Sequence, residues 1–161
     1  MAEHEGALRR VARIYAGQRA DYDDLLQEIA FAVWGALPRF EGKSSLRTFL
    51  FRIAHNRGIR FLAQHRSSSS TRGSAGDDFA DLVDTQPDPE STAISRQKHN
   101  HVVEAVQNLP LALRQILSLA MEQLSHREIA EVLGISESNV AVRLHRARQA
   151  LRALLEKNHG R

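Results

Sequence analysis

The chain has 161 residues, of which 42% are hydrophobic and 25% are charged, and its formal net charge is +3. A chain of this length holds one medium domain or two small ones, with enough apolar side chains for a packed core. It contains no cysteine, which excludes a disulfide framework and a thiolate metal site. No apolar run resembles a signal peptide or approaches the roughly 20 residues that cross a bilayer, so we expect a cytoplasmic protein without membrane insertion.

The charge is divided into three blocks along the chain. Residues 1–66 carry 11 basic and 7 acidic side chains, net +4, and residues 96–161 carry 10 and 6, also net +4. Between them, residues 67–95 carry 1 basic and 6 acidic side chains, net −5. Two basic blocks indicate a polyanionic partner such as nucleic acid, although a modest basic excess is more often only a solvated surface.

The first strongly patterned stretch, DYDDLLQEIAFAVWGA, predicts a helix because its apolar residues recur at three- and four-residue spacing. One face carries the expected core residues Leu25, Ile29, Ala32, Val33 and Ala36. The opposite face carries Asp24, Gln27, Phe31 and Trp34. Aromatic side chains opposite a core face either pack against another helix or form a protein-docking surface, and the pattern favours neither.

A Gly/Ser loop, EGKSS at 41–45, comes next and leads into a second predicted helix. This helix carries Arg47, Arg52, His55, Asn56 and Arg60. A basic helix beside such a loop, with Phe and His side chains nearby, suits single-stranded or melted nucleic acid, whose bases can be stacked or captured in pockets. On this stretch alone, a solvated basic helix is the slightly better interpretation.

The acidic block is rich in Ser, Gly, Asp and Pro and poor in apolar residues. Such a segment cannot bury enough surface to offset the entropy lost on ordering. We therefore expect a flexible linker at 66–95 between a domain at 1–65 and a domain at 96–161.

The C-terminal domain contains EIAEVLGISESNVAVRLHRAR. Ser125 followed by Glu128 forms a capping box, which predicts a helix that begins at His126. Gly134 is placed to end that helix in a left-handed conformation, and Ser136 can cap the next one. A short helix, a tight Gly-containing turn and a second helix predict a helix-turn-helix.

The second helix of this motif has two unlike sides. At 100° per residue, its apolar side gathers Val140, Leu144, Ala147, Leu151 and Leu154. The opposite side, which is free to enter a major groove, gathers Ser138, Ala141, Val142, His145, Arg146 and Gln149. Arg146 can reach a guanine or a phosphate, and Arg143 and Arg148 flank the apolar side, where phosphate contacts are expected. The pattern favours DNA binding over an amphipathic hairpin with a solvated basic face.

Both flanking units are therefore predicted to be helical, and the fold class is all-α, with two small helical domains. The order DDLLQEIAFAVW, F-x-G-K-S-S-L-R-T-F-L-F-R-I-A-H-N, a polar linker, LP-x-x-x-R-Q-I-L and the helix-turn-helix resembles a bacterial extracytoplasmic-function (ECF) sigma factor of the sigma-70 family. The resemblance covers nearly the whole chain except the linker and the ends.

This resemblance implies two helical domains, sigma regions 2 and 4, in a factor that binds core RNA polymerase and initiates transcription at promoters. The polymerase clamp would dock on Asp24, Gln27 and Glu28, with Phe31 and Trp34 close by. The loop from Phe40 to Ser45 and the following helix would recognise and help to melt the promoter's minus-ten element, with one flipped base held by the loop. The acidic linker would thread through the polymerase towards the RNA path.

The resemblance also assigns the DNA contacts residue by residue. The minus-ten set consists of Lys43, Ser44, Ser45, Arg47, Arg52, His55, Asn56 and Arg60. The minus-thirty-five set consists of Ser138, Asn139, Ala141, Val142, Arg143, His145, Arg146 and Arg148. The expected partners are core RNA polymerase, promoter DNA as duplex and as melted strands, and an anti-sigma factor, because no accessory domain follows Arg161. We expect no enzyme activity, catalytic residue, cofactor or metal.

The chain departs from the family pattern at four positions. Family members often carry Lys or Arg where this chain has Ala141, and Ser where it has Val142. Arg57 stands where an apolar residue is usual, and Gly58 follows it within a helix, at a cost of about 1 kcal/mol relative to Ala. These departures leave the predicted function intact. Because of them, the promoter sequence that other family members recognise should not be assigned to this chain.

Other classes fit less well. A metal-dependent helical-bundle enzyme would need carboxylate–histidine pairs at i, i+3 or i+4 on two helices, and none repeats here. A sigma-factor mimic that only sequesters an anti-sigma factor should lose its basic recognition face, whereas Arg143, Arg146 and Arg148 remain. A helix-turn-helix regulator that does not bind polymerase is the other alternative.

Overall fold

The computed structural model describes residues 2–16, 19–68 and 89–159. Within these ranges every regular element is a helix, which confirms the all-α prediction. The elements are, in chain order, α1 (Ala2–Tyr15), α2 (Arg19–Ala36), the short 3-10 helix η1 (Leu37–Arg39), α3 (Leu46–Ser68), α4 (Pro89–Gln107), α5 (Leu111–Met121), α6 (His126–Leu133) and α7 (Glu137–His159).

The segment predicted as a flexible linker lies for the most part outside the described residues. Its two ends are described, and they are helical: α3 continues to Ser68, and α4 begins at Pro89. The helices therefore extend further into the predicted linker, 66–95, than the sequence pattern indicated.

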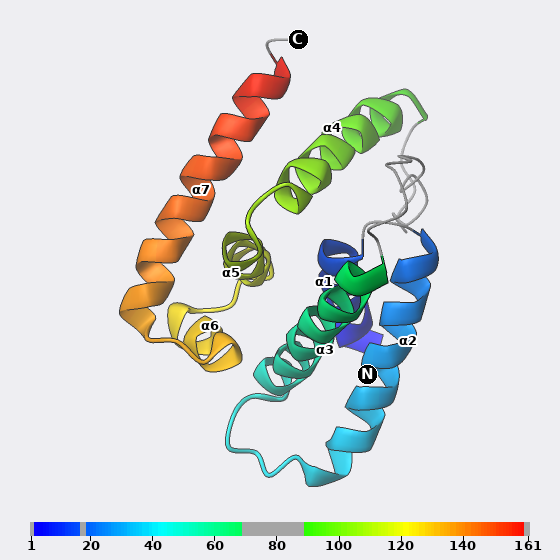
Figure 1. Cartoon of the computed structure of the whole chain (residues 1–161), viewed down its shortest axis with the longest axis vertical. Coiled ribbons are helices and arrows are strands. Elements are labelled where there is room, and N and C mark those ends of the chain that lie inside the picture. Colours follow the sequence, from blue (N-terminus) through cyan, green and yellow to red (C-terminus); the bar gives the residue numbers. More distant parts are fainter. Residues whose placement is uncertain (1, 17–18, 69–88, 160–161) are drawn as a thin grey trace.

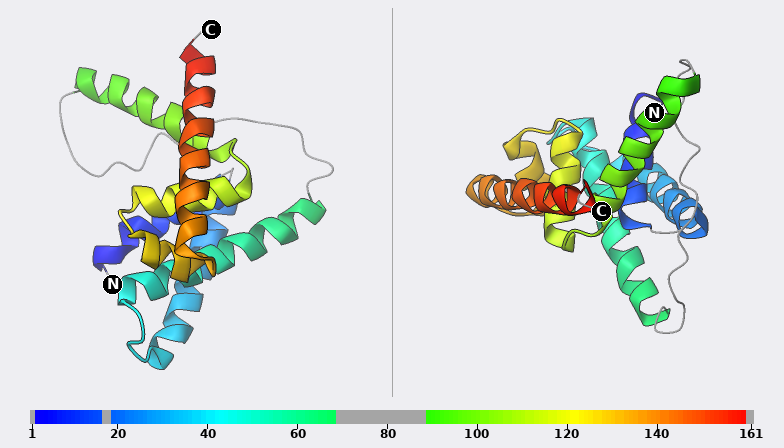
Figure 2. Two further views of the ribbon diagram at one scale, coloured as in Figure 1. Left: turned by 90° about the vertical axis from the view of Figure 1, so that its left-hand side faces the viewer. Right: turned by 90° about the horizontal axis from the view of Figure 1, so that it is seen from above.

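Helices α1, α2 and α3 pack against one another and form the N-terminal domain (Figure 1). The predicted core face of α2 is confirmed, since Leu25, Ile29 and Val33 are fully buried. Ala32 and Ala36, at the edge of this face, are half-buried. The C-terminal half of α3 projects from the rest of the molecule in both views of Figure 2.

Gly58 marks the place where α1 and α3 approach most closely. It is buried within α3, and a Cβ atom added to it would lie 2.5 Å from Cγ and 2.7 Å from Cε2 of the Tyr15 ring. Atoms at these distances overlap, so the ring occupies the space that any side chain would need. Gly58, one of the four departures from the family pattern, is therefore explained by its packing against the Tyr15 ring.

The helix-turn-helix forms as its local signals predict. Ser125 Oγ accepts a hydrogen bond from the backbone N–H of Glu128, and the Glu128 carboxylate accepts one from the backbone N–H of Ser125, which completes the capping box. Gly134 ends α6 in the left-handed conformation with φ 66°. Ser136 Oγ accepts from the N–H of Asn139 at the start of α7. Helix α6 is thus fixed at both ends.

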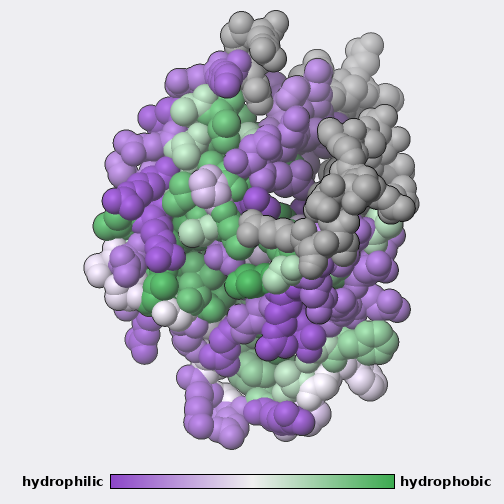
Figure 3. All heavy atoms as spheres, in the orientation of Figure 1, coloured by the Kyte–Doolittle hydropathy of each residue, from purple (hydrophilic) through white to green (hydrophobic). Residues whose placement is uncertain are grey.

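Helix α7 rests on α5 and α6, and α4 packs along it as well. Its predicted apolar side is confirmed: Val140, Leu144 and Ala147 are buried, and Leu151 and Leu154 are half-buried. Figure 3 shows apolar surface gathered on the side of α7 that faces α4, and polar surface on the outward side.

The two domains also pack against each other. Helix α3 contacts α6, and α1 contacts both α4 and α5 (Figure 1). The buried apolar side chains of the two domains form one continuous cluster. None of the helices in the described ranges is long and apolar enough to cross a membrane.

Candidate nucleic-acid interface

Three surfaces hold the residues that the sequence assigns to function. We call them the docking surface on α2 (Asp24, Gln27, Glu28, Phe31 and Trp34), the minus-ten surface on the loop before α3 and on α3 itself (Lys43, Ser44, Ser45, Arg47, Arg52, His55, Asn56 and Arg60), and the recognition surface on α7 (Ser138, Asn139, Ala141, Val142, Arg143, His145, Arg146 and Arg148).

The docking surface is open to solvent. Phe31 is 72% exposed and Trp34 is 76% exposed, so neither aromatic ring is used in packing between helices. Asp24 and Gln27 are exposed on the same helix, and Glu28 is half-buried. Exposed aromatic side chains of this size, beside polar groups, are typical of a protein-binding surface.

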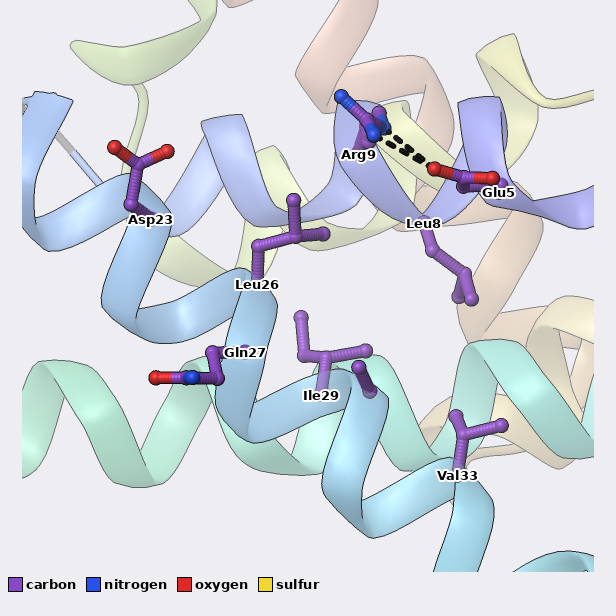
Figure 4. A pocket seen from close by; sticks show the side chains of 9 residues that line it. Glu5, Leu8, Arg9, Asp23, Leu26, Gln27, Ile29 and Val33 are labelled. Atoms are coloured by element: carbon purple, nitrogen blue, oxygen red, sulfur yellow. Dashed lines mark hydrogen bonds and ion pairs between the residues drawn. The ribbon is translucent and has the colours of Figure 1, made fainter.

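A groove of 380 Å³ lies beside the docking surface, between α1 and α2. Figure 4 shows Leu8 from α1 and Leu26 and Ile29 from α2 converging on this space. At its rim Arg9 donates two hydrogen bonds to Glu5, one turn earlier on α1, at 3.2 and 2.6 Å. The groove therefore adds an apolar depression to the face that carries the exposed aromatic rings.

The minus-ten surface is assembled around a pair of aromatic rings at the start of α3. The rings of Phe40 and Phe49 lie 4.9 Å apart, and the guanidinium of Arg52 lies over Phe49 at 5.8 Å from the ring centre. Lys43 forms an exposed ion pair with Glu41 in the loop. Aromatic rings beside a cation can receive an unstacked base. Phe49 is not among the residues that the sequence pattern assigned to this surface, although its position among basic residues was a signal for it.

Not every residue predicted for the minus-ten surface reaches solvent. Lys43, Asn56 and Arg60 are exposed, and Ser44 and Arg52 are half-buried. Ser45 is exposed, but its hydroxyl accepts a hydrogen bond from the N–H of Thr48 and so caps α3. The remaining two residues, Arg47 and His55, have partners inside the protein.

His55, one of the residues predicted for this surface, lies inside the protein. Its side chain is 1% exposed, and its Nδ1 is hydrogen-bonded to the hydroxyl of Tyr15 on α1. Burial lowers the pKa of His55 to about 3, so the imidazole is neutral at physiological pH. A neutral, buried imidazole cannot contact a phosphate in this conformation. The basic character of the neighbouring sequence concealed that this position faces α1.

Arg47, also predicted for this surface, has a partner in the other domain. It donates a hydrogen bond to the backbone carbonyl of Glu122, at the end of α5 in the other domain. Its guanidinium also lies 5.7 Å from the centre of the Phe51 ring. The contact of Arg47 with DNA stays a prediction, and in this structure Arg47 lies at the contact between the two domains.

The recognition surface agrees well with the sequence pattern. Seven of its eight residues are exposed, with Val142 at 48%, and the remaining residue, Arg143, is half-buried beside the apolar side. The exposed residues follow a capped helix start, and N-terminal residues of a recognition helix contact base edges in helix-turn-helix proteins. Arg146 and Arg148 extend from the next turns, where bases and phosphates are both within reach of long basic side chains.

The described residues contain no group of three or more His, Asp or Glu side chains that could hold a metal ion. What the three surfaces offer is positive charge, exposed aromatic rings and a helix that can enter a groove. This chemistry suits protein docking and nucleic-acid binding.

Comparison with known proteins covers both domains. Residues 1–68 match the family described as sigma-70 region 2, and residues 99–151 match the one described as sigma-70, region 4. RNA polymerase sigma factor NccH from Alcaligenes xylosoxydans xylosoxydans is 34% identical over 95% of this chain and 83% of its own length. The ECF RNA polymerase sigma-E factor of Escherichia coli is 31% identical over 81% of this chain and 72% of its own.

Solved structures share the fold. CnrH, whose structure is solved in complex with the cytosolic domain of CnrY, superposes with a TM-score of 0.68 at 28% identity, over 97% of this chain and 84% of that one. CnrH is a sigma factor of Cupriavidus metallidurans that is 32% identical to this chain over 97% of this chain and 84% of its own length. From its sequence, its fold and these relatives, the chain belongs to the ECF group of the sigma-70 family and is a sigma factor that directs RNA polymerase to promoters, not an enzyme.

Proposed function

We propose that α2 is the helix through which this sigma factor docks on core RNA polymerase. The observation that supports this assignment is the exposure of Phe31 and Trp34, at 72% and 76%, on the side of α2 that the N-terminal domain does not bury. Leaving two aromatic rings in water is unfavourable for a free domain, and a partner that covers them gains the burial of their apolar area.

Docking can be tested with the double variant Gln27→Ala, Trp34→Ala. Both side chains are exposed, so the variant should fold like the wild type and lose co-purification with core polymerase. Met121→Ala is a matched control, because Met121 is another exposed apolar side chain, at 58%, that lies on a different helix. A double variant that folds normally and still co-purifies at full strength would show that the assigned surface is wrong.

For promoter recognition we propose that the recognition surface binds the minus-thirty-five element and the minus-ten surface binds the melted minus-ten element. Exposed Arg146 and Arg148 on the outward side of α7 support the first assignment. The Phe40, Phe49 and Arg52 cluster beside the loop supports the second. Run-off transcription with core polymerase on candidate promoters tests both, because a sigma-factor mimic would give no transcript.

We also propose a cytoplasmic protein with an anti-sigma factor as its regulator. The related CnrH was solved with the cytosolic domain of CnrY bound, which supports a protein partner for this chain as well. Such a partner would compete with polymerase for the docking surface and the adjoining groove. Pull-down from the native host, with the Gln27→Ala, Trp34→Ala variant as the comparison, would identify it.

A further inference from the structure

Val142 is an apolar side chain on the outward side of α7. It is 48% exposed, and it lies two residues after buried Val140 and two residues before buried Leu144. Two residues of an α-helix turn through about 200°, so Val142 points away from the core that holds the other two. Ala141, beside it, is exposed as well. We call these two side chains, Ala141 and Val142, the methyl patch.

The C-terminal domain itself gains little stability from a valine at this position. Val is a poorer helix former than Ala, because its branched side chain is restricted beside the preceding turn. Val142 is also half in solvent and outside the buried cluster. The same restriction favours binding, since Val holds essentially one rotamer in a helix and its methyl groups are fixed before a partner arrives.

Helix α7 holds the methyl patch in a defined position. Ser136 Oγ accepts a hydrogen bond from the N–H of Asn139 at 3.2 Å, which fixes the first turn of the helix. Buried Val140 and Leu144 fix the second turn against the domain. When α7 lies in a groove, the place of the methyl patch is therefore set by the helix and not by a mobile side chain.

Basic side chains surround the methyl patch. Arg146 is exposed one turn after Val142, Arg148 is exposed in the same turn as Arg146, and Arg143 is half-buried beside the apolar side of α7. An apolar group framed by arginines suits the floor of a duplex groove, whose walls are phosphates, better than it suits an apolar protein surface. The partner that fits the patch is duplex DNA, and the inference below rests on the proposed function of the recognition surface.

Thymine is the base whose major-groove edge matches an apolar side chain. Its C5 methyl group is an apolar group at that edge, whereas a G·C pair presents the O6 and N7 acceptors and the N4 donor. Against Val142 these polar groups would lose water without gaining a hydrogen bond, which is unfavourable. The small side chain of Ala141 keeps the surface beside Val142 low, so that α7 can approach the bases closely.

We propose that Val142, with Ala141 beside it, reads the methyl group of a thymine in the minus-thirty-five element. Val142 and Arg146 are one turn apart, or about 6 Å along the helix axis, and a base pair occupies about 3.4 Å of the duplex. The thymine therefore lies about one to two base pairs from the base that Arg146 contacts. Both positions of the methyl patch depart from the family pattern, so this preference belongs to this chain.

The first experiment locates the thymine. The full chain is combined with core polymerase and selects from a duplex library that is randomised over both promoter elements. We expect the wild type to enrich thymine at a base pair of the minus-thirty-five element, and Val142→Ala to lose this enrichment while it keeps the rest of the selected sequence. The base pair at which the two selections differ is the one that Val142 meets.

The second experiment removes the methyl group alone. Deoxyuridine in place of that thymine keeps every hydrogen-bonding group of the base and lacks only the C5 methyl group. We expect the wild type to bind the deoxyuridine duplex about fourfold more weakly, because one methyl-sized group is left in water. Val142→Ala should bind the two duplexes nearly alike. With a G·C pair at this position, 5-methylcytosine should bind the wild type better than cytosine does, and fluorescence anisotropy measures each Kd.

Met121→Ala is the matched control, because it truncates another exposed apolar side chain of the C-terminal domain, at 58% on α5. Its loss of affinity for deoxyuridine should equal that of the wild type, and circular dichroism shows whether the helices of each variant are intact. Identical selections by the wild type and Val142→Ala, or equal binding of the thymine and deoxyuridine duplexes by the wild type, would overturn the methyl contact and leave promoter recognition standing. A selection without any preference in the minus-thirty-five element would instead refute the proposed function of the recognition surface, and the methyl contact with it.

Discussion

At the scale of single residues, Gly58 shows how a position that disfavours a helix can be required by packing. Within α3, Gly is about 1 kcal/mol less favourable than Ala, yet the Tyr15 ring fills the space of a side chain. We expect Gly58→Ala to lower the free energy of unfolding by about 1–3 kcal/mol, because overlap with the ring outweighs the gain in helix propensity.

Gly35→Ala is the control for this prediction. Gly35 is also helical and has no atom within 4 Å of an added Cβ, so Ala should raise stability there by about 0.5–1 kcal/mol. Urea unfolding followed by circular dichroism measures both. A Gly58→Ala variant as stable as Gly35→Ala would mean that α1 and α3 do not approach this closely.

A second prediction at this scale assigns different DNA contacts to two arginines of α7. Arg146 lies opposite the apolar side, and Arg148 lies nearer to it and later in the helix, so we expect a base contact for Arg146 and a phosphate contact for Arg148. Arg146→Ala should cost about 1–3 kcal/mol and relax the preference at one base. Arg148→Ala should weaken all sequences alike and lower the salt slope by roughly one unit.

Binding to single-base variants of the minus-thirty-five element at several salt concentrations measures the two effects. If Arg146→Ala weakened every sequence equally while Arg148→Ala changed the preference at one base, the two roles would have to be exchanged.

At the scale of elements, the local sequence predicts some helices better than others. The boundaries of α6 and the two sides of α7 follow from Ser125, Gly134 and the apolar spacing, because caps and periodicity depend only on near neighbours in the chain. The burial of His55 and the contact of Arg47 with Glu122 were not predictable, because both depend on helices that are distant in sequence. The packing of α1 against α5 was not predictable for the same reason, since the two helices are distant in sequence.

The capping box of α6 gives a prediction at this scale. Ser125→Ala removes the acceptor for the N–H of Glu128 and should destabilise the C-terminal domain by about 1 kcal/mol. Ser125→Thr keeps the hydroxyl and should leave stability close to that of the wild type. Thermal unfolding of the two variants checks this, and equal midpoints would show that the cap does not limit the stability of α6.

At the scale of the whole molecule, the two halves of the chain perform different tasks and share one contact. The N-terminal domain carries the docking and minus-ten surfaces, and the C-terminal domain carries the recognition surface. Their contact is polar at its rim, through Arg10, Glu122 and Arg47, and apolar beneath, in the cluster that joins the two cores. Polar rims of this kind allow domains to separate more readily than large apolar interfaces do.

Buried between α3 and α1 of the N-terminal domain, His55 makes stability depend on pH. Its pKa is about 3 in the folded chain because of burial, and about 6.5 when the chain is unfolded. The unfolded state therefore binds the proton more tightly, so His55 supports the folded state fully above pH 6.5 and progressively less as pH falls towards 3. The slope is about 1.4 kcal/mol per pH unit, or about 2 kcal/mol between pH 6.5 and 5.

The window above pH 5 separates the loss due to this histidine from the loss due to Glu128 in the first turn of α6. The pKa of Glu128 is lowered by its hydrogen bonds to Ser125, so its contribution is lost only as pH falls below about 4.5. We expect urea unfolding of the wild type to show the loss between pH 6.5 and 5, and His55→Gln, which does not titrate, to show none. His101→Gln, a change at an exposed histidine, should behave like the wild type. A wild type equally stable at both pH values would mean that His55 is not buried, and the same loss in His55→Gln would place the responsible proton on another group.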